Sequence, residues 1–379
     1  MEKLLDGVEV EWKSLGEVAE LKRGKTITAK TKIAGDIPVI SGGQTPAYYN
    51  SEYNRDGETI TVAGSGAYAG YIMYWNKPIF VSDAFSVKPN LEVLNTKYVY
   101  HFLINNQEWI HNLQKGSGVP HVYPKDLSML QIPIPPIKVQ EEIVRILDTF
   151  TELTAELTAE LTARKKQYEY YRDKLLTFED GQVEWKTLGE VGEFVRGNGL
   201  QKSDFTEEGV GCIHYGQIYT YYGLFTSETK SFVSPALASK LRKAQKGDLI
   251  IATTSENIED VCKPLVWLGD EEVCISGETY IFKHNQNPKY LAYYLQTPMF
   301  FDYKKQNRTG TKVIRVHGDK LEKFPIPIPS LEEQERIVSI LDKFDALTSS
   351  ITEGLPREIE LRKKQYEYYR NMLLSFPKE

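Results

Sequence analysis

The chain has 379 residues, of which 41% are hydrophobic and 26% are charged, and its formal net charge is −6 at pH 7. This composition is typical of a globular protein that can bury more than one hydrophobic core, and it excludes a uniformly basic chain. The first residues contain no apolar run long enough for a signal peptide, and no stretch of about 18 apolar residues occurs. We therefore expect a cytoplasmic protein without membrane spans.

The three cysteines, Cys212, Cys262 and Cys274, are widely spaced in the second half of the chain. Their number is odd, and no Cys-x-x-Cys or comparable metal-ligand spacing occurs. The sequence thus indicates neither a disulfide framework nor a zinc site. We expect buried or inert thiols and no bound metal.

The charged residues are unevenly distributed. Residues 1–136 carry 13 Lys and Arg against 14 Asp and Glu, and residues 181–330 carry 18 against 18. The excess acid therefore lies in the segments 137–180 and 331–379. Two nearly neutral regions could read DNA bases but could not supply many phosphate contacts. If the chain binds DNA, we expect partner subunits to clamp the backbone.

The first predicted region is an α+β lobe over residues 1–136. Short apolar or alternating runs, separated by glycine, asparagine and serine turns, predict four strands and one helix. They lie at residues 37–40, 59–63, 71–74, 79–82 and 98–112. The lobe ends in Ile132-Pro133-Ile134-Pro135-Pro136. Because proline lacks a backbone donor, we expect an edge or polyproline-like strand that leads into the next helix.

A long helix is predicted at about residues 138–178, within a central helical spacer over 137–180. From Ile143 to Phe178 its apolar positions alternate in steps of four and three residues, which predicts a heptad seam and a coiled-coil partner. In its middle, Thr154-Ala-Glu-Leu157 is followed directly by Thr158-Ala-Glu-Leu161.

The same order of elements returns in a second lobe over residues 181–330 and a distal helical region over 331–379. The runs that predict its strands and its helix lie at residues 247–252, 261–268, 276–282 and 288–303. A second proline run, Pro325–Pro329, precedes a helix with Ser330 and Glu333 in capping-box spacing. A four-residue stutter in its heptads coincides with Gly354-Leu355-Pro356, which should kink or break this helix.

Three repeated blocks show that the chain is a duplication. The nonapeptide Arg-Lys-Lys-Gln-Tyr-Glu-Tyr-Tyr-Arg occurs at 164–172 and, unchanged, at 362–370. The proline blocks are followed by matching helix starts, and residues 10–18 are echoed at 183–191. The chain therefore has the order lobe, helix, lobe, helix.

Two divergent lobes alternating with two near-identical helical regions resemble the specificity subunit of type I restriction-modification systems, over essentially the whole chain. The resemblance implies a specific fold: two pseudo-repeated α/β target-recognition domains separated by two long antiparallel helices that form a coiled coil. It implies that each lobe reads one half of an asymmetric, bipartite target in double-stranded DNA. The helices would set the spacer and dock the partner subunits.

The implied partners are two modification (methyltransferase) subunits, to which restriction (endonuclease and translocase) subunits add. S-adenosylmethionine would belong to the modification subunit, and ATP with magnesium to the restriction subunit. This chain would carry no cofactor of its own.

Candidate base contacts in the first lobe lie in three glycine-containing loops, 41–49, 64–68 and 115–121. A glutamine can pair with adenine N6 and N7, although an ordinary turn with tyrosines packed beneath it is the alternative. The candidates are Gly42, Gly43, Gln44, Tyr48, Tyr49, Ser65, Ser117 and His121.

The second lobe offers three comparable segments, 214–219, 253–257 and 308–312. An arginine there could bind guanine O6 and N7 or a phosphate, or could belong to a solvated loop. The candidates are Tyr215, Gln217, Tyr219, Thr254, Ser255, Asn257, Arg308, Thr311 and Lys312.

The nonapeptides are candidate docking sites for partner subunits, and the alternative is solvated charge with partly covered tyrosines. The candidates are Arg164, Lys165, Tyr168, Tyr171, Arg362, Lys363, Tyr366 and Tyr369.

The sequence shows no recognisable catalytic motif. The sequence has no HExxH, no GxSxG and no methyltransferase-type Asn-Pro-Pro-Tyr or Asp-Pro-Pro-Tyr motif. Glu-Trp-Lys at 11–13 and 184–186 is nuclease-like only in the weakest sense, and its place in the first strand of each lobe favours structure. We expect a non-catalytic protein without catalytic or metal-binding residues. A scaffold that binds no DNA and a nuclease built from paired lobes are the alternatives.

The tandem tetrads give a spacing hypothesis. One Thr-Ala-Glu-Leu tetrad adds about 6 Å of helix and roughly 40° of rotation. On B-DNA this corresponds to on the order of one to two base pairs. We expect an inserted tetrad to lengthen the spacer and leave both half-sites intact.

Overall fold

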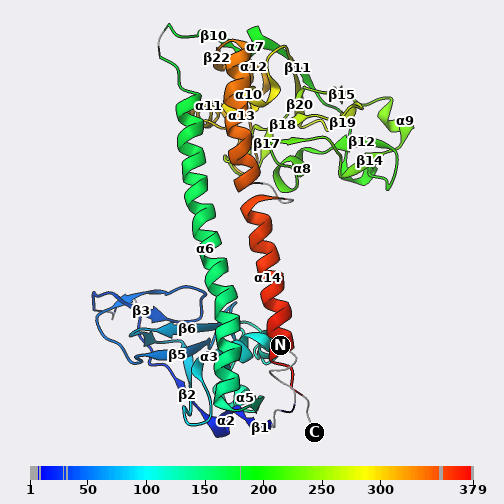
Figure 1. Ribbon diagram of the computed structural model, residues 1–379. Coiled ribbons are helices and arrows are strands. Elements are labelled where there is room, and N and C mark those ends of the chain that lie inside the picture. The colour runs from blue at the N-terminus through cyan, green and yellow to red at the C-terminus, as the bar shows by residue number, and fades with distance from the viewer. Residues whose placement is uncertain are drawn as a thin grey trace. The chain divides into compact units, whose positions relative to one another are not determined.

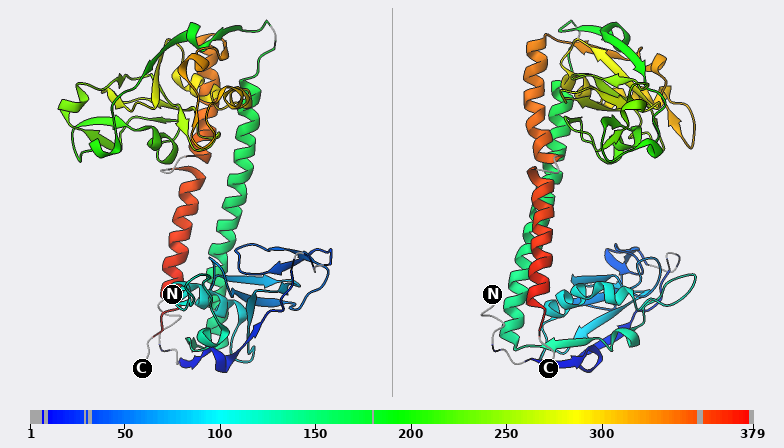
Figure 2. Two further views of the ribbon diagram at one scale, coloured as in Figure 1. Left: turned by 180° about the vertical axis from the view of Figure 1, so that it is seen from behind. Right: turned by 90° about the vertical axis from the view of Figure 1, so that its right-hand side faces the viewer.

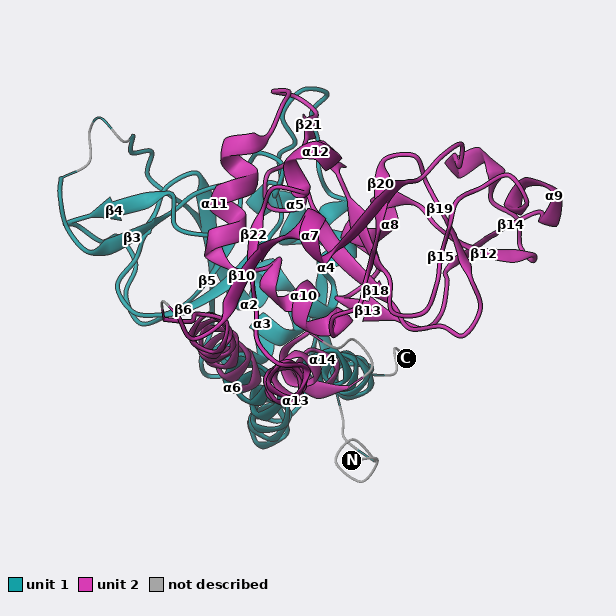
Figure 3. Cartoon of the chain, turned by 90° about the horizontal axis from the view of Figure 1, so that it is seen from above, with its two compact units in different colours: residues 1–156, 359–379 teal, residues 157–358 magenta. Residues whose placement is uncertain are grey.

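The computed structural model describes residues 7, 10–28, 30, 33–179, 181–349 and 353–376. These residues form two compact units. Unit 1 contains residues 1–156 and 359–379, and unit 2 contains residues 157–358 (Figure 3). Each unit thus combines one lobe with segments from both helical regions. The proposed domain limits follow the order of the sequence, whereas the units regroup segments that are distant in it.

Unit 1 is built on antiparallel strands. One sheet has the order β2-β8-β5-β6 and another the order β4-β3-β7, in which β3 and β7 are parallel, while β1 pairs with β9. Their bounds are β1 Glu11–Ser14, β2 Ala19–Arg23, β3 Ile37–Ile40, β4 Tyr48–Asn50, β5 Glu58–Ala63, β6 Ile72–Asn76, β7 Phe80–Val81, β8 Ala84–Pro89 and β9 Gln131–Ile134. Figure 2 shows these sheets beside the helical segments of the same unit. The four predicted strands are therefore present, with ends shifted by one or two residues.

The helices of the first lobe are short. They are α2 Leu15–Val18, α3 Thr96–Asn105, α4 Gln107–His111 and α5 Pro124–Leu127. The single helix predicted over 98–112 is wrong, because it is interrupted at Asn106. The Asn106 side chain donates to the carbonyl of Phe102, 2.8 Å away, and such local bonds compete with helix continuation.

Helix α6, Ile137–Leu175, is one continuous helix of 39 residues (Figure 1). Its first half shares the core of unit 1 with the C-terminal segment, since Ile143 and Leu147 belong to the same buried cluster as Leu373 and Leu374. The Phe150 and Tyr369 rings stack with centroids 5.1 Å apart. The heptad seam is confirmed within this unit as a packed helix pair.

Unit 2 has a larger set of strands. Its sheets have the orders β11-β20-β16-β18-β13, β14-β12-β19-β15, β17-β21 and β10-β22. The strands are β10 Glu184–Thr187, β11 Gly192–Arg196, β12 Val210–Ile213, β13 Phe225–Thr226, β14 Ser231–Val233, β15 Lys243–Ala244, β16 Leu249–Ala252, β17 Thr254–Ser255, β18 Lys263–Trp267, β19 Val273–Ile275, β20 Thr279–His284, β21 Ile314–Arg315 and β22 Pro325–Ile328. The three predicted strands correspond to β16, β18 and β20.

Most helices of unit 2 begin with a capping residue. They are α7 Leu188–Val191, α8 Tyr215–Thr220, α9 Pro235–Ala238, α10 Pro288–Tyr294, α11 Pro298–Asn307, α12 Gly318–Leu321 and α13 Leu331–Thr348, with a 3-10 turn at Lys202–Asp204. The single helix predicted over 288–303 is wrong. It divides because Thr297 caps a new helix that starts at Pro298.

The distal helical region is broken where the stutter predicted it. Helix α13 ends at Thr348, and α14, Gly354–Leu373, begins at the predicted Gly-Leu-Pro site. Gly354 has φ +76°, and a Cβ there would overlap the carbonyl oxygen of Ala346. Glycine is therefore required at this start.

The proline runs form edge pairs. In β1-β9, Trp12 lies opposite Pro133, and in β10-β22, Trp185 lies opposite Pro327. The repeated Glu-Trp-Lys thus lies in a paired strand of each lobe, in agreement with its structural interpretation. All three cysteines are free and buried, and burial raises the pKa of the Cys212 thiol to about 12.

Candidate nucleic-acid interface

Three loops of unit 1 converge, and all three contain predicted contact residues. Gly42 approaches the backbone of Ser65 so closely that a Cβ would overlap the Ser65 carbonyl oxygen. Ser65 in turn forms a β-bridge with His121. Loops 41–49, 64–68 and 115–121 therefore form one continuous surface.

The third loop is a tight hairpin. Lys115 and His121 exchange two backbone hydrogen bonds of 2.9 Å each. Gly116 has φ +112°, in the left-handed region that favours glycine. Ser117 lies exposed at its tip.

An exposed carboxylate that the sequence did not single out, that of Asp83, lies next to these loops. The Ser65 hydroxyl donates to Asp83, and the Gly64 amide donates to the Asp83 carbonyl at 3.2 Å. The Arg23 guanidinium lies 5.7 Å from the centre of the Tyr123 ring. Asp83, Arg23, His121 and Tyr123 line a pocket of about 190 Å³. The one related signal in the sequence is that Arg23-Gly24 of the first lobe recurs as Arg196-Gly197 in the second.

The remaining candidates of unit 1 differ in accessibility. Gln44 is exposed, as is Tyr49 at 51%. Gly43 is half-buried, and the Tyr48 hydroxyl donates to the carbonyl of Ile27 at 2.6 Å, so it also supports the fold. Base contact by any of them stays a prediction.

Unit 2 repeats this arrangement with different side chains. Strand β17 pairs with β21, so that Thr254 lies opposite Arg315. Thr309 and Arg315 close a hairpin through two backbone hydrogen bonds of 2.7 and 2.9 Å. Gly310 takes the place of Gly116, with φ +82°. Thr311 and Lys312 lie exposed on this hairpin, and Arg308 lies exposed just before it.

Glu278 takes the place of Asp83. The Thr254 hydroxyl donates to its carboxylate, and the Thr253 amide donates to its carbonyl at 3.0 Å. Arg315 Nε lies 3.5 Å and Arg196 Nη2 3.9 Å from this carboxylate. The Thr254 hydrogen bond, followed by the charges of Arg315 and Arg196, outweighs burial and lowers the pKa of Glu278 below its usual value.

Several predicted residues of unit 2 are engaged in its fold. The Tyr219 hydroxyl donates to the carbonyls of Ala252 and Thr254, and Gln217 donates to the Ser231 hydroxyl at 2.7 Å. Asn257 donates to Asp260 at 2.9 Å.

Two further candidates of this unit are buried or half-buried. Ser255 is buried, and the half-buried Tyr215 ring lies 4.4 Å from the His214 ring. The structure brings Thr254 and Ser255 to the hairpin, and places Tyr215, Gln217 and Asn257 in their own local networks.

The two nonapeptides contain half-buried and exposed positions. The ring centroids of Tyr168 and Tyr171 lie 6.3 and 5.6 Å from that of Phe344 within unit 2, and Tyr168 is half-buried whereas Tyr171 is 37% exposed. Tyr366 and Tyr369 are half-buried in unit 1.

Each nonapeptide has exposed lysines and at least one exposed tyrosine. Lys165 and Lys363 are exposed, while Arg164 and Arg362 are half-buried. The most exposed tyrosines are Tyr170 and Tyr368, at 60% and 64%, which the sequence reasoning did not select.

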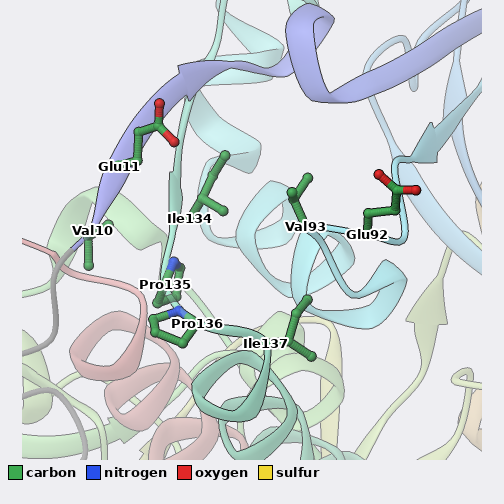
Figure 4. A pocket seen from close by; sticks show the side chains of 8 residues that line it. All are labelled: Val10, Glu11, Glu92, Val93, Ile134, Pro135, Pro136 and Ile137. Carbon is green, nitrogen blue, oxygen red and sulfur yellow. The ribbon is translucent and has the colours of Figure 1, made fainter.

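A larger pocket of about 740 Å³ lies elsewhere in unit 1 (Figure 4). Val10, Val93, Ile134, Pro135, Pro136 and Ile137 form its apolar lining, with Glu11 and Glu92. Two carboxylates and no basic side chain make it unfavourable for phosphate. We therefore exclude it from the candidate interface.

Among the described residues, no helix is long and apolar enough to cross a membrane. Nor does any group of three or more His, Cys, Asp or Glu side chains gather there in a way that could hold a metal ion.

Comparison with known proteins identifies the family. The family model for the type I restriction modification DNA specificity domain matches residues 7–164 and 182–361. The specificity subunit of the type I restriction enzyme EcoR124I/EcoR124II from Escherichia coli is 35% identical over 100% of this chain and 97% of its own length. A putative type I restriction enzyme specificity subunit from Haemophilus influenzae is 34% identical over 99% and 98%.

A solved structure has the same fold. The type I restriction-modification S subunit from M. genitalium superposes with a TM-score of 0.61 at 19% identity, and covers 99% of this chain and 98% of its own. The duplicated lobes and helical regions, the family match over both halves and these relatives lead to one conclusion: the chain belongs to the family of type I restriction-modification specificity subunits.

Proposed function

We propose that this chain gives a type I restriction-modification complex its DNA sequence specificity. Each lobe, residues 1–136 and 181–330, reads one half of a bipartite target. The observation that carries this proposal is the matched hairpin in each unit. Lys115–His121 and Thr309–Arg315 have the same backbone frame around different side chains. A common frame with different exposed groups is suited to reading two different sequences.

The chain itself performs no chemistry in this proposal. Modification subunits supply the methyltransferase activity with S-adenosylmethionine, and restriction subunits supply ATP-dependent cleavage. The nearly neutral lobes leave most phosphate contacts to these partners. Exposed positions of the nonapeptides, including Lys165 and Lys363, contribute to docking them.

Methylome sequencing tests the proposal. Cells that express the chain with its modification subunit are expected to show methylation at one motif with two specified halves and an unspecified spacer. Replacing residues 181–330 with the corresponding lobe of a relative should change one half only, which we define as the second half-site. Methylation without a bipartite motif, or a replacement that changes both halves, would overturn it.

The continuous helix α6 contains both tetrads, and this supports the spacing role. Duplicating Thr158–Leu161 should lengthen the spacer by about one or two base pairs. The nonapeptide and both lobes are unchanged in this variant, so both half-sites are expected to persist. An unchanged spacer would contradict this role of the tetrads.

A further inference from the structure

One arginine of unit 2, Arg315, occupies a backbone position that has a direct counterpart in unit 1. Arg315 stands where unit 1 has His121, since each closes its hairpin and each lies opposite a hydroxyl residue, Thr254 or Ser65. The next residue in each hairpin continues the match. Val316 donates to the Thr253 carbonyl and Val122 to the Gly64 carbonyl, both at 3.1 Å. The backbone position is therefore the same, and the side chain differs.

A carboxylate also occupies equivalent positions in the two units, that of Asp83 in unit 1 and that of Glu278 in unit 2. Asp83 and Glu278 each accept a hydrogen bond from the hydroxyl residue of the frame, over 18 and 24 residues of sequence. In unit 2 this holds Glu278 beside the Arg315 guanidinium, with Nε 3.5 Å away. The Arg315 side chain is 48% exposed, so it is held from one side and open on the other.

This environment favours a base edge over a phosphate. Glu278 is ionised at neutral pH, because the Thr254 hydrogen bond and Arg315 keep its pKa low. The Glu278 charge partly neutralises the Arg315 guanidinium and weakens its attraction for a phosphate, whereas the neutral edge of a base can still accept hydrogen bonds from it. It also limits the rotation of the arginine, which favours a bidentate contact.

We propose that Arg315 is a specificity-determining residue that reads one guanine of the second half-site through O6 and N7, with Glu278 as its positioning residue. The proposal rests on the proposed function and assigns one base of it to one side chain. Arginine donates to both guanine acceptors in the major groove. Glutamine instead matches N6 and N7 of adenine, so Arg315→Gln is expected to change the base preferred at this position.

The test compares methylomes of cells that express the modification subunit with the wild-type chain, Arg315→Gln or a matched control. Lys246→Gln is the control, because Lys246 also forms an exposed ion pair, 2.7 Å from Asp270, away from the hairpin. Arg315→Gln should reduce methylation of the guanine-containing sites by about 10- to 100-fold and favour adenine there. The first half-site and the spacer should stay as in the wild type.

The variant Arg308→Gln distinguishes a general effect of losing one positive charge from the specific effect of losing Arg315. Arg308 is exposed beside the same hairpin without the Glu278 pair, and we expect its loss to weaken methylation at all sites while the motif is kept. Arg315→Lys retains the charge but lacks the planar pair of guanidinium donors, so it should relax discrimination at the same base. This variant keeps the test valid if Arg315→Gln fails to fold.

Three results would overturn the inference: an unchanged motif in Arg315→Gln, a change in the first half-site, or full guanine discrimination in Arg315→Lys. An absent bipartite motif in the wild type would instead overturn the proposed function.

Discussion

The two units attach a lobe to the helices through the same lysine–aspartate pair but with different aromatic partners. In unit 1, Asp148 pairs with Lys97, and its Oδ1 lies 2.9 Å from His101 Nε2. The other ring nitrogen of His101 lies 3.1 Å from the Tyr366 hydroxyl.

In unit 2, Asp342 pairs with Lys289 at 2.6 Å and accepts from the Tyr293 hydroxyl at 2.7 Å. The lysine and the aspartate are kept, and a histidine is exchanged for a tyrosine. The attachment of each lobe to its helix, here called the joint, therefore has a constant charged pair and a variable aromatic partner. A support that is used for different lobes requires this combination.

A buried glutamine is common to both joints and gives the largest expected effect. Gln140 accepts from the Asn95 amide at 2.8 Å and donates to the Val93 and Pro135 carbonyls at 2.8 Å each. Gln140→Ala leaves these groups unpaired in the interior, and we expect a loss of about 3–5 kcal/mol in the stability of unit 1.

Gln334 is the matched residue of unit 2, and it accepts from the Asn287 amide at 2.9 Å. Gln334→Ala should destabilise unit 2 by a similar amount. Hydrogen exchange read by mass spectrometry assigns each loss to a unit. Equal deprotection of both units by one variant would break the comparison.

A histidine of unit 2 gives a pH dependence that distinguishes the units. Burial lowers the pKa of His284 to about 4, and its Nδ1 accepts from the Gln286 amide at 3.2 Å. The folded state therefore resists protonation that the unfolded chain accepts below its ordinary pKa of about 6.5.

The resulting stability is complete above pH 6.5 and is lost as the pH falls towards 4, by up to about 3 kcal/mol. Urea unfolding of unit 2, followed by hydrogen exchange between pH 7 and 4.5, measures the loss. His284→Phe should flatten the profile. An equally steep profile in that variant would show that another group is responsible.

The joint carboxylates should have the smallest effect and sharpen the comparison most. Burial opposes ionisation of Asp148, but hydrogen bonds from His101 and Lys97 outweigh it and lower its pKa. A lowered carboxyl pKa gives stability that is present above pH 4 and is lost as the pH falls further.

Asp148→Asn is expected to cost about 1–3 kcal/mol at pH 7, because it removes charge-assisted hydrogen bonds. Asp342→Asn should cost a comparable amount in unit 2. The free energy of unfolding of each variant is measured in urea at pH 7 and pH 3.5, where the Asp148 variant should differ less from the wild type. A cost that does not shrink at low pH would contradict the ionic role of Asp148.

The sequence predicted the parts of the fold that are long or repeated. The heptads from Ile143 onward, the edge strands at the proline runs and the break at Gly354 follow from periodicity and from backbone chemistry, and all three are present. The sheet β14-β12-β19-β15 was missed, because strands of two to four residues are too short to show a period.

The loops of the candidate interface were predictable from the sequence, but the carboxylates that hydrogen-bond to them were not. Glycines and polar side chains marked segments 41–49, 64–68 and 115–121, and the structure brings them together. Asp83 and Glu278 gave no signal, because each one contacts a hydroxyl that is distant in the sequence. Arg315 was overlooked because its partner, the Glu278 carboxylate, is also distant in the sequence.

The central claim is that the two lobes are equivalent readers on interchangeable joints. Its most direct test is a chain in which residues 10–136 replace residues 183–330, so that both positions carry the first lobe. Methylome sequencing with the modification subunit should then give a motif whose two half-sites are both copies of the first, with the spacer retained. A motif that still contains the original second half-site, or sequence-specific methylation with a new and unrelated second half, would contradict the account.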